Sequence, residues 1–395
     1  MGLIIAGLVG LFLLVFFLPI RGKRYKKAVP VRHLDERDTM FSRNEIKPGE
    51  DRFDEYYKLR PGKLEEDNKF RAKPGLLKEG STYYNRMAFA AADASFEAVE
   101  AFFDLRSKSM EQGAGSKGEE VESVRVGDEE NLTPFIKEWT KKMGAHSVGI
   151  AEMKDYHFYT VAGRKERYGK PVVNNHKYGI ALCVEMDYEL TMSGPQAPVV
   201  MESARQYLNS GMIATQLALT LRNLGYEATT HIDANYDVIC PLVAKDAGLG
   251  EIGRMGLLMT PKLGPRVRIA VVTTDAPLIP DSPTHSDSVL DFCTECKKCA
   301  RVCPSAAIPG DARKQHKGGL HWQVNQEACF SYWCQAGTDC GRCMAVCPYS
   351  HKSNWLHKIA RWGINNNVFF RRAAIRLDDL IYGSKPRSAN PPVWV

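Results

Sequence analysis

The hydrophobic pattern begins with an uncharged run from residue 3 to residue 20. At about 1.5 Å per residue in a helix, this run would span about 27 Å, enough to cross the hydrocarbon core of a bilayer. Five basic residues follow between Arg21 and Lys27, and no charge precedes the run, so the positive-inside rule places the rest of the chain on the cytoplasmic side. A signal peptide would instead need a basic segment first and a small-residue cleavage site. We therefore expect an uncleaved, single-pass anchor in the cell membrane over residues 1–22.

Residues 23–132 form the next unit of the pattern. Residues 28–80 are polar and rich in Pro, Gly and charge, with irregularly spaced aromatic residues. This segment predicts an extended arm laid across another domain. Apolar residues from 85 to 106 recur at helical spacing, and residues 107–130 are typical of a charged surface loop.

Helices and buried strands alternate over residues 133–285, which predicts an α/β core. Thr133 and Pro134 are typical of a helix start, and this helix should end near Met143. A long apolar-faced helix is expected over residues 198–223. Buried strands are expected at 147–151, 178–186, 227–232 and 267–273.

The composition is that of a globular protein, with 44% hydrophobic and 25% charged residues among 395. The net charge of +7 is mild, and no basic stripe is interleaved with aromatic residues. Nucleic acid is therefore not an expected partner. Nine of the eleven cysteines lie between Cys293 and Cys347 at short spacings, which argues against a disulfide scaffold. Cys183 and Cys240 are expected to be small buried hydrophobes.

Two cysteine runs carry the strongest chemical signal, and each ends in Cys-Pro. This spacing is that of bacterial ferredoxins with two [4Fe-4S] clusters, in which the fourth Cys of a run binds the other cluster. A zinc ribbon also uses paired cysteines, but the two-run arrangement and the Cys-Pro pairs argue against it. We expect a ferredoxin-like domain over residues 286–350, followed by a C-terminal tail over residues 351–395. The runs comprise Cys293, Cys296, Cys299 and Cys303, then Cys340, Cys343 and Cys347.

The ligands can be divided between the two clusters, with one place left open. The first cluster takes the first three cysteines of the first run together with Cys347. The second takes Cys303, Cys340 and Cys343, and its fourth ligand is either Cys329 or Cys334. Spacing alone does not distinguish these two.

A glycine-rich loop contains Gly248, Gly250 and Gly253. Three glycines permit close backbone approach to a large ligand. The fit to a dinucleotide-binding fingerprint is imperfect, so a tight structural turn and a cofactor-cradling loop both remain open.

Several short motifs in a fixed order resemble those of the reductive dehalogenases that depend on a corrinoid and iron–sulfur clusters. The resemblance spans about residues 30–358, and its matching segments are residues 35–43, 224–226, 247–254, 264–268 and 274–278, both cysteine runs and residues 347–350. It implies a nitroreductase-like α/β domain that binds a base-off corrinoid, followed by the ferredoxin-like domain. The region over residues 23–132 would contribute to the cofactor and substrate pocket. Asp155 and His157 begin the D-x-H-x-x-G signature of other corrinoid proteins, but Thr160 replaces its glycine. We therefore expect His157 to be an ordinary histidine and not a cobalt ligand.

The resemblance also implies residue roles. Tyr207 matches the tyrosine that gives the proton, Ser203 lies four residues earlier on the same helical face, and a nearby cation should stabilise the phenolate. Arg266 and Arg268 should share one face of a strand, and Arg268 is the favoured partner. Asn235 and Phe41 are weaker candidates for the cofactor and substrate pocket. Cys329 becomes the favoured fourth ligand of the second cluster, because an Asn before it and aromatic residues after it match the family.

The implied reaction replaces a carbon-bound halogen with hydrogen, using a low-potential donor such as ferredoxin, flavodoxin or a membrane quinol chain. The protein could also assemble with further copies of itself as a homo-oligomer. Exported members carry a twin-arginine signal and use a separate membrane anchor, which this chain does not match. Two alternatives remain: an epoxyqueuosine reductase, which would need a basic face for tRNA, and a membrane-anchored electron-transfer subunit.

Overall fold

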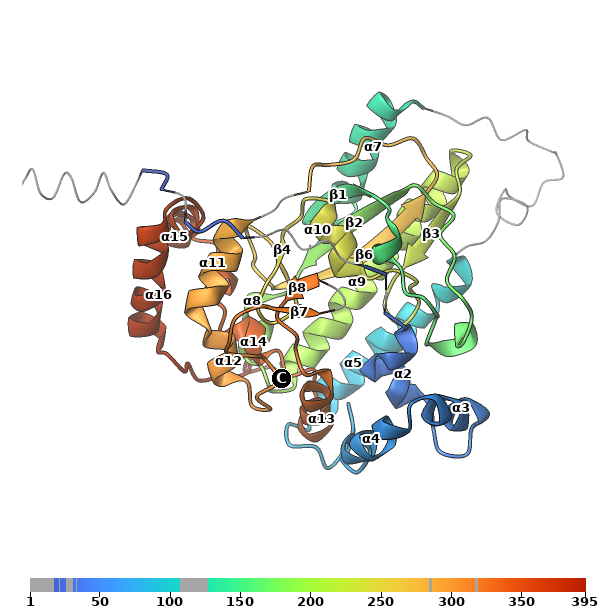
Figure 1. The fold of residues 1–395 in the computed structure, drawn as a ribbon, viewed down its shortest axis with the longest axis horizontal. Coiled ribbons are helices and arrows are strands. Elements are labelled where there is room, and N and C mark those ends of the chain that lie inside the picture. The colour runs from blue at the N-terminus through green and yellow to red at the C-terminus, as the bar shows by residue number, and fades with distance from the viewer. Residues whose placement is uncertain are drawn as a thin grey trace, which may run out of the picture.

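A computed structural model describes residues 18–20, 22–25, 31–32, 34–106, 127–283, 286–316 and 319–395. An α/β body carries smaller helical regions at one end and along one side (Figure 1). The predicted anchor over residues 1–22 lies mostly outside the described residues. Among the helices that are described, none is both long enough and apolar enough to span a membrane.

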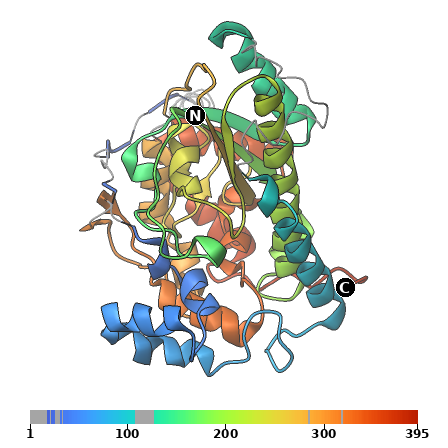
Figure 2. The ribbon, with the colours of Figure 1, turned by 90° about the vertical axis from the view of Figure 1, so that its right-hand side faces the viewer.

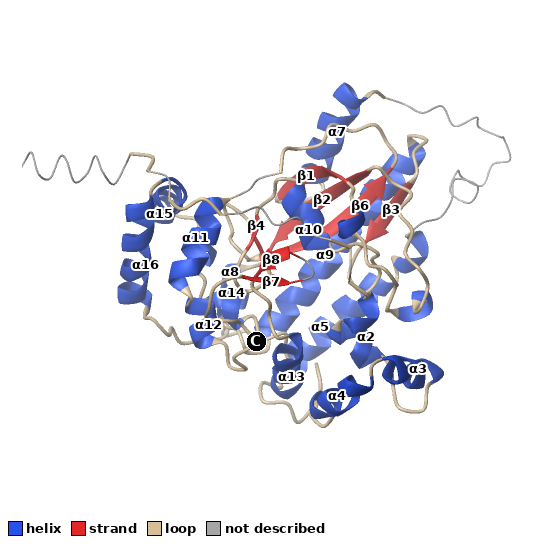
Figure 3. Ribbon diagram, viewed as in Figure 1, coloured by secondary structure: helices blue, strands red, loops and turns tan. Residues whose placement is uncertain are grey.

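Four strands form the central sheet in the order β1-β2-β6-β3, and all neighbours are antiparallel (Figure 3). All four predicted strands are present, with small differences at their ends. Ile180 at the centre of β2 pairs with Ile150 of β1 and with Val272 of β6. The strands are β1 (Ser147–Glu152), β2 (Tyr178–Glu185), β3 (Ala228–His231) and β6 (Val267–Thr274).

Helices cover both faces of this sheet, so its central strands are buried on both sides. Leu182 and Val272 face the long helix α9 (Pro198–Asn223), whose bounds match the prediction, while Cys183 and Val271 face the opposite layer. Alternate strand residues point to opposite faces, so the two cores separate cleanly. Figure 2 shows α5 (Arg86–Glu100) lying along α9.

The remaining elements of the body complete these two layers. On the α9 side lies α7 (Glu129–Lys142), which begins before the predicted Thr133 because Asp128 caps it by accepting from the Asn131 N–H. On the other side lie α10 (Cys240–Asp246) and a hairpin of β4 (Glu251–Ile252) and β5 (Leu258–Met259). The short α8 (Tyr188–Met192) precedes α9.

The predicted extended arm is wrong, because residues 40–71 are largely helical. Arg43 is fully buried, and it binds Asp67 on α4 and Glu327 on α13, the latter at 2.7 Å. These partners are far apart in sequence, so the contacts stabilise the arm without producing a helical pattern of hydrophobic residues in the arm's own sequence. The arm contains α2 (Met40–Glu45), α3 (Asp51–Leu59) and α4 (Leu64–Arg71).

The cysteine-rich region is built from short helices and one small hairpin, and the predicted tail contains two further helices. The region comprises α11 (Asp287–Cys296), α12 (Lys298–Val302), β7 (Lys314–His316), β8 (Gly319–His321), α13 (Gln326–Ala336) and α14 (Arg342–Ala345). The tail forms α15 (Trp355–Asn366) and α16 (Val368–Tyr382), and both pack against α11.

Candidate active site and metal-ligand cysteines

Tyr207 on α9 lies beside Arg268 on β6. The guanidinium carbon of Arg268 is 5.0 Å from the centroid of the Tyr207 ring. Burial raises the pKa of the Tyr207 hydroxyl above its ordinary value, and the charge of Arg268 acts in the opposite direction. The effect of burial on this pKa outweighs that of the cation. Tyr207 therefore keeps its proton at neutral pH, next to a positive charge suited to stabilise its phenolate.

A hydrogen-bonded network fixes the position of Arg268. Its Nη2 donates to the hydroxyl of Ser203 at 2.6 Å and to Oδ2 of Asp339 at 2.9 Å. The Ser203 hydroxyl donates to the same carboxylate oxygen. Burial alone would lower the pKa of Arg268, but Tyr207, Asp339 and Asp233 raise it. The cation on β6 is therefore held in place from two sides, by α9 and by the segment before the second cysteine run.

Arg266 lies elsewhere. Its Nη1 donates to Glu185 at 2.8 Å and to the carbonyl of Met186, and its guanidinium lies 5.7 Å from the Tyr188 ring. Arg266 precedes the first residue of β6, so strand alternation does not extend to it. Both arginines contact Met186, but their other partners differ. The structure places Arg268, and not Arg266, against Tyr207.

Three charged residues at this site were missed by the sequence. Asp339 closes the network described above, although burial raises its pKa. Asp233 and Arg164 act electrostatically on Tyr207 from two other segments. None of the three belongs to a recognisable motif; the one available signal was the position of Asp339 directly before Cys340.

The two weaker candidates have structural partners. The side-chain oxygen of Asn235 accepts from Nη1 of Arg106 at 3.1 Å. Phe41 packs against Phe330 and Trp333 of α13, with ring centroids 5.8 Å and 6.0 Å away, and Arg164 lies 5.4 Å above its ring. Contact of Asn235 or Phe41 with a cofactor or substrate stays a prediction.

The glycine loop forms a tight turn at the end of α10. Gly248 has a left-handed φ of +77°, which favours glycine. A Cβ on Gly250 would collide with the carbonyl oxygen of Met259 on β5. Close backbone packing therefore explains Gly250, and contact of Gly248 or Gly250 with a cofactor stays a prediction.

His157 is a core histidine, as expected. It is fully buried, its Nδ1 accepts from the backbone N–H of Lys154 at 3.1 Å, and its Nε2 lies 3.1 Å from Asp246. Because Nδ1 accepts, Nε2 carries the proton and donates to the carboxylate. Both ring nitrogens are engaged, so neither is available to a metal.

The cysteines of the two runs separate into two groups. Burial raises the pKa of Cys347 well above its ordinary value, and Cys293, Cys296 and Cys299 raise it further. All four thiols lie in one buried apolar cluster. Burial likewise raises the pKa of Cys343, with contributions from Cys340, Cys329 and Cys303, and also from Cys299 of the other group. These influences follow the division predicted from spacing in most cases, but Cys299 acts on Cys343, and Cys303 and Cys343 pack against the cluster that holds the first group. The division of the ligands between two clusters stays a prediction.

The two candidates for the open ligand position have different surroundings. Burial raises the pKa of Cys329 to about 11, and the next contributions come from Cys303 and Asp339. Cys334 instead responds to Lys73 and Lys47, and it packs with Met40 and Phe70 of the arm. Cys329 lies with the second group and Cys334 does not.

Among the described residues, no three His, Cys, Asp or Glu side chains come close enough together to hold a single metal ion.

Arg254 ties the glycine loop to the first cysteine group. Its Nε donates to the carbonyl of Cys293 at 2.9 Å, its Nη1 donates to Pro309 and Asp311 at 2.7 Å and 2.8 Å, and it lies 4.6 Å above the Trp322 ring. Burial lowers the pKa of Arg254, and the cysteines of this group oppose the shift. A buried cation therefore stands beside the first group.

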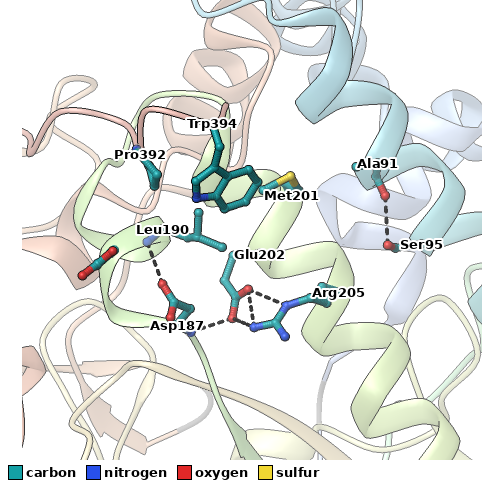
Figure 4. Close-up of a pocket in the computed structure, with 10 residues that line it drawn as sticks. Ala91, Ser95, Asp187, Leu190, Met201, Glu202, Arg205, Pro392 and Trp394 are labelled. Atoms are coloured by element: carbon teal, nitrogen blue, oxygen red, sulfur yellow. Dashed lines mark hydrogen bonds and ion pairs between the residues drawn. The ribbon is translucent and has the colours of Figure 1, made fainter.

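A surface pocket of about 520 Å³ lies near the start of α9 (Figure 4). Its charges are paired internally: Glu202 accepts from Arg205 at 2.8 Å and from the Asp187 backbone N–H at 2.6 Å. Trp394 lines the pocket from the C-terminal segment, and Tyr207 and Arg268 are not among its lining residues. This pocket is separate from the candidate site.

Comparison with known proteins finds matches to the cysteine-rich region and to a longer part of the chain. A family model described as a 4Fe-4S dicluster domain matches residues 292–351. A tetrachloroethene reductive dehalogenase of Sulfurospirillum multivorans is 30% identical over 294 residues, which cover 65% of this chain and 58% of the relative. The enzyme of the same name from Desulfitobacterium hafniense is 32% identical over 297 residues, covering 61% of this chain and 53% of the relative. The chain is similar to these reductive dehalogenases over about three fifths of its length.

Solved structures extend the likeness to nearly the whole chain. A catabolic reductive dehalogenase in complex with 3-bromo-4-hydroxybenzoic acid matches with a TM-score of 0.68 and 27% identity, covering 90% of this chain and 49% of that one. A reductive dehalogenase described for B12-dependent dehalogenation matches with a TM-score of 0.70 and 25% identity, covering 93% and 49%. The resemblance inferred from the motifs is confirmed. The chain spans about half the length of the relatives it matches.

The epoxyqueuosine reductases match a shorter region. The enzyme of Listeria monocytogenes is 28% identical over 123 residues, covering 27% of this chain and 28% of the relative.

Proposed function

We propose that this protein is a reductive dehalogenase that replaces a carbon-bound halogen with hydrogen: R–X + 2e⁻ + H⁺ → R–H + X⁻. The observation that carries the proposal is the position of Tyr207 against Arg268. A protonated phenol with a fixed cation at its ring lies in the α/β body, and Asp339 joins it to the second cysteine group.

The residues fit the cofactors that the family implies. The two groups of four cysteines would hold two [4Fe-4S] clusters, with Cys329 completing the second. For a base-off corrinoid, the fit rests on two features. His157 is not free to bind cobalt, and Nε of Arg268 and Oδ1 of Asp339 are buried without a hydrogen-bond partner among the described residues. When bound, the corrinoid would supply the strongly reducing cob(I) state that breaks the carbon–halogen bond.

The protein's own part is to deliver one proton and to stabilise the charge left behind. The Tyr207 hydroxyl donates the proton to the carbon from which the halide departs. The phenolate that remains is stabilised by Arg268, which Ser203 and Asp339 hold in position. A proton from solvent then restores the phenol before the next turnover.

Electrons would reach the site through the clusters. Asp339 contacts Arg268 and acts on Cys329 of the second group, so this group lies next to the candidate site. The first group, buried with Met255 and Trp322, would receive electrons from a low-potential donor of the ferredoxin, flavodoxin or quinol type. The uncharged run at residues 3–20 and the basic residues after it favour a single-pass anchor in the cell membrane, with this domain on the cytoplasmic side.

The test is halide release by the full chain. The protein is purified without oxygen, reconstituted with iron, sulfide and corrinoid, and given tetrachloroethene or 3-bromo-4-hydroxybenzoic acid with a low-potential donor. We expect about eight irons and one cobalt per chain, and halide release that requires the corrinoid. Iron without cobalt under every condition would favour the electron-transfer alternative. Bound cobalt without halide release from either substrate, together with reduction of epoxyqueuosine, would favour the tRNA-modifying alternative.

A further inference from the structure

The end of the molecule formed by α15 and the start of α16 carries a cluster of exposed apolar residues. Trp355 is 68% exposed and Trp362 is 44% exposed, with Leu356 and Ile359 between them and Phe369 at the corner of the two helices. Positions 355, 359 and 362 follow one face of a helix. The opposite face, with Gly363 and Ile364, is buried. We call these five exposed residues the α15 face.

The described N-terminal residues are fastened to the same corner. The side-chain amide of Asn367 donates to the carbonyl of Leu18 at 2.8 Å, and the N–H of Val368 donates to the carbonyl of Ile20 at 3.0 Å. In Figure 1 the short stretch of described N-terminal residues lies beside α15. The 17 residues that precede Leu18 contain no charged side chain. In sequence, the uncharged run therefore leads directly into residues that are bound beside the α15 face.

The charges at this end are predominantly basic. The sequence of α15 contains no Asp or Glu. Lys358 on α15, Arg372 and Arg376 on α16, and Lys23 and Arg24 after the N-terminal run are all exposed. The two carboxylates of α16, Asp378 and Asp379, are bound to Lys298 and Arg301. The surface therefore offers cations to a negatively charged partner.

We propose that the α15 face lies in the interface of an anionic lipid bilayer. Helices with an apolar face, tryptophans and basic flanks bind in this way, and tryptophan favours the level of the lipid headgroups. The uncharged sequence upstream of Leu18 points to lipid as the occupant, because Leu18 itself is hydrogen-bonded to Asn367 beside the face. The proposal does not depend on the reaction that the protein catalyses.

This arrangement would bring the first cysteine group near the bilayer. Lys298, which lies between Cys296 and Cys299 in the chain, is buried and bound to Asp378 and Asp379 of α16. The α15 and α16 pair thus connects the lipid-facing end to the cysteines expected to hold the first cluster.

Tryptophan quenching by brominated lipids tests the proposal on the full chain. The protein is incorporated into vesicles of phosphatidylcholine and phosphatidylglycerol, with bromine on the acyl chains of one lipid at a time. We expect strong quenching by brominated phosphatidylglycerol, and loss of most of it in the double variant Trp355→Phe/Trp362→Phe. The matched control is Trp139→Phe, because Trp139 on α7 is 37% exposed and lies outside the face.

The outcomes separate lipid from other occupants. If the double variant is quenched as strongly as the parent, the two tryptophans lie outside the bilayer and the proposal is wrong. Equal quenching by both brominated lipids would overturn the preference for anionic headgroups. If Trp355 and Trp362 become shielded from acrylamide in lipid-free detergent as the protein concentration rises, a second copy of the chain covers the face instead. Iron content reports that each variant is folded.

Discussion

Replacing Arg268 by Gln separates the electrostatic role of this residue from its structural role. The cation lies 5.0 Å from the Tyr207 ring. With an effective dielectric constant of about 20, a unit charge at that distance contributes about 3 kcal/mol to the phenolate. The loss should slow halide release in a single turnover by about 10²-fold. Asp339 would also lose its buried partner, at a cost of about 3–5 kcal/mol in the free energy of unfolding.

The double variant Arg268→Gln/Asp339→Asn distinguishes these two effects. It removes both charges, so it should recover most of the lost stability while halide release stays slow. The matched control is Arg266→Gln, which removes a buried arginine that faces Glu185 and Tyr188 instead of Tyr207. Halide release per folded enzyme is measured anaerobically in each variant. If Arg266→Gln slows it as much as Arg268→Gln, or if Arg268→Gln leaves it unchanged, the assignment of the cation is wrong.

Three further predictions concern the clusters, the pH dependence and the fold. Cys329→Ser should lower the iron content from about eight to about four per chain while Cys334→Ser keeps it, and the reverse result would exchange their roles. Burial raises the pKa of Glu36 from 4.5 to about 7, so its contribution to stability is complete below pH 4.5 and is lost as the pH rises to about 7. At pH 8, Glu36→Gln should therefore be more stable than the parent by about 3 kcal/mol in the free energy of unfolding, and it should unfold at a higher temperature. At pH 4 the two proteins should be equally stable. A stability difference that does not vary with pH would contradict this. Gly250→Ala should destabilise by about 1–3 kcal/mol in chemical denaturation, because its methyl meets a carbonyl oxygen of β5, whereas Gly62→Ala, which meets nothing within 4 Å, should not.

The elements that the sequence predicted well are those with strong local signals. The long helix α9 begins with Pro198 and is followed by Gly225 with a left-handed φ, and both are recognisable boundaries. The strand β2 is apolar along its length because both faces of the sheet are covered. Cysteine spacing predicted the 4Fe-4S dicluster domain that the family model matches over residues 292–351, because such a domain places most of its ligands in short loops.

The elements that the sequence missed depend on distant partners. The helices of the arm are held by the buried Arg43, whose partner Glu327 lies on α13. A short, charged helix of this kind has little helical periodicity of its own, so the pattern suggested an extended segment. The C-terminal helices were missed in the same way, because α16 depends on Arg371 binding Asp291 of α11.

In the candidate site, too, some residues were predictable from the sequence and others depend on contacts between distant segments. The family resemblance pointed to Tyr207 and Ser203, but only the folded chain brings Asp339 to them. The choice between Arg266 and Arg268 depends on their partners, because Tyr207, Ser203 and Asp339 surround Arg268 whereas Glu185 and Tyr188 surround Arg266. The position of Cys334 in the arm's apolar cluster was likewise not predictable from spacing.

The most direct test of the account is single-turnover halide release by Tyr207→Phe. The substitution removes the proton and keeps the ring that packs against Arg268 and Phe96. We predict unchanged iron and cobalt contents, an unchanged unfolding temperature and at least a 10²-fold loss of halide release. Undiminished halide release by this variant would contradict the account.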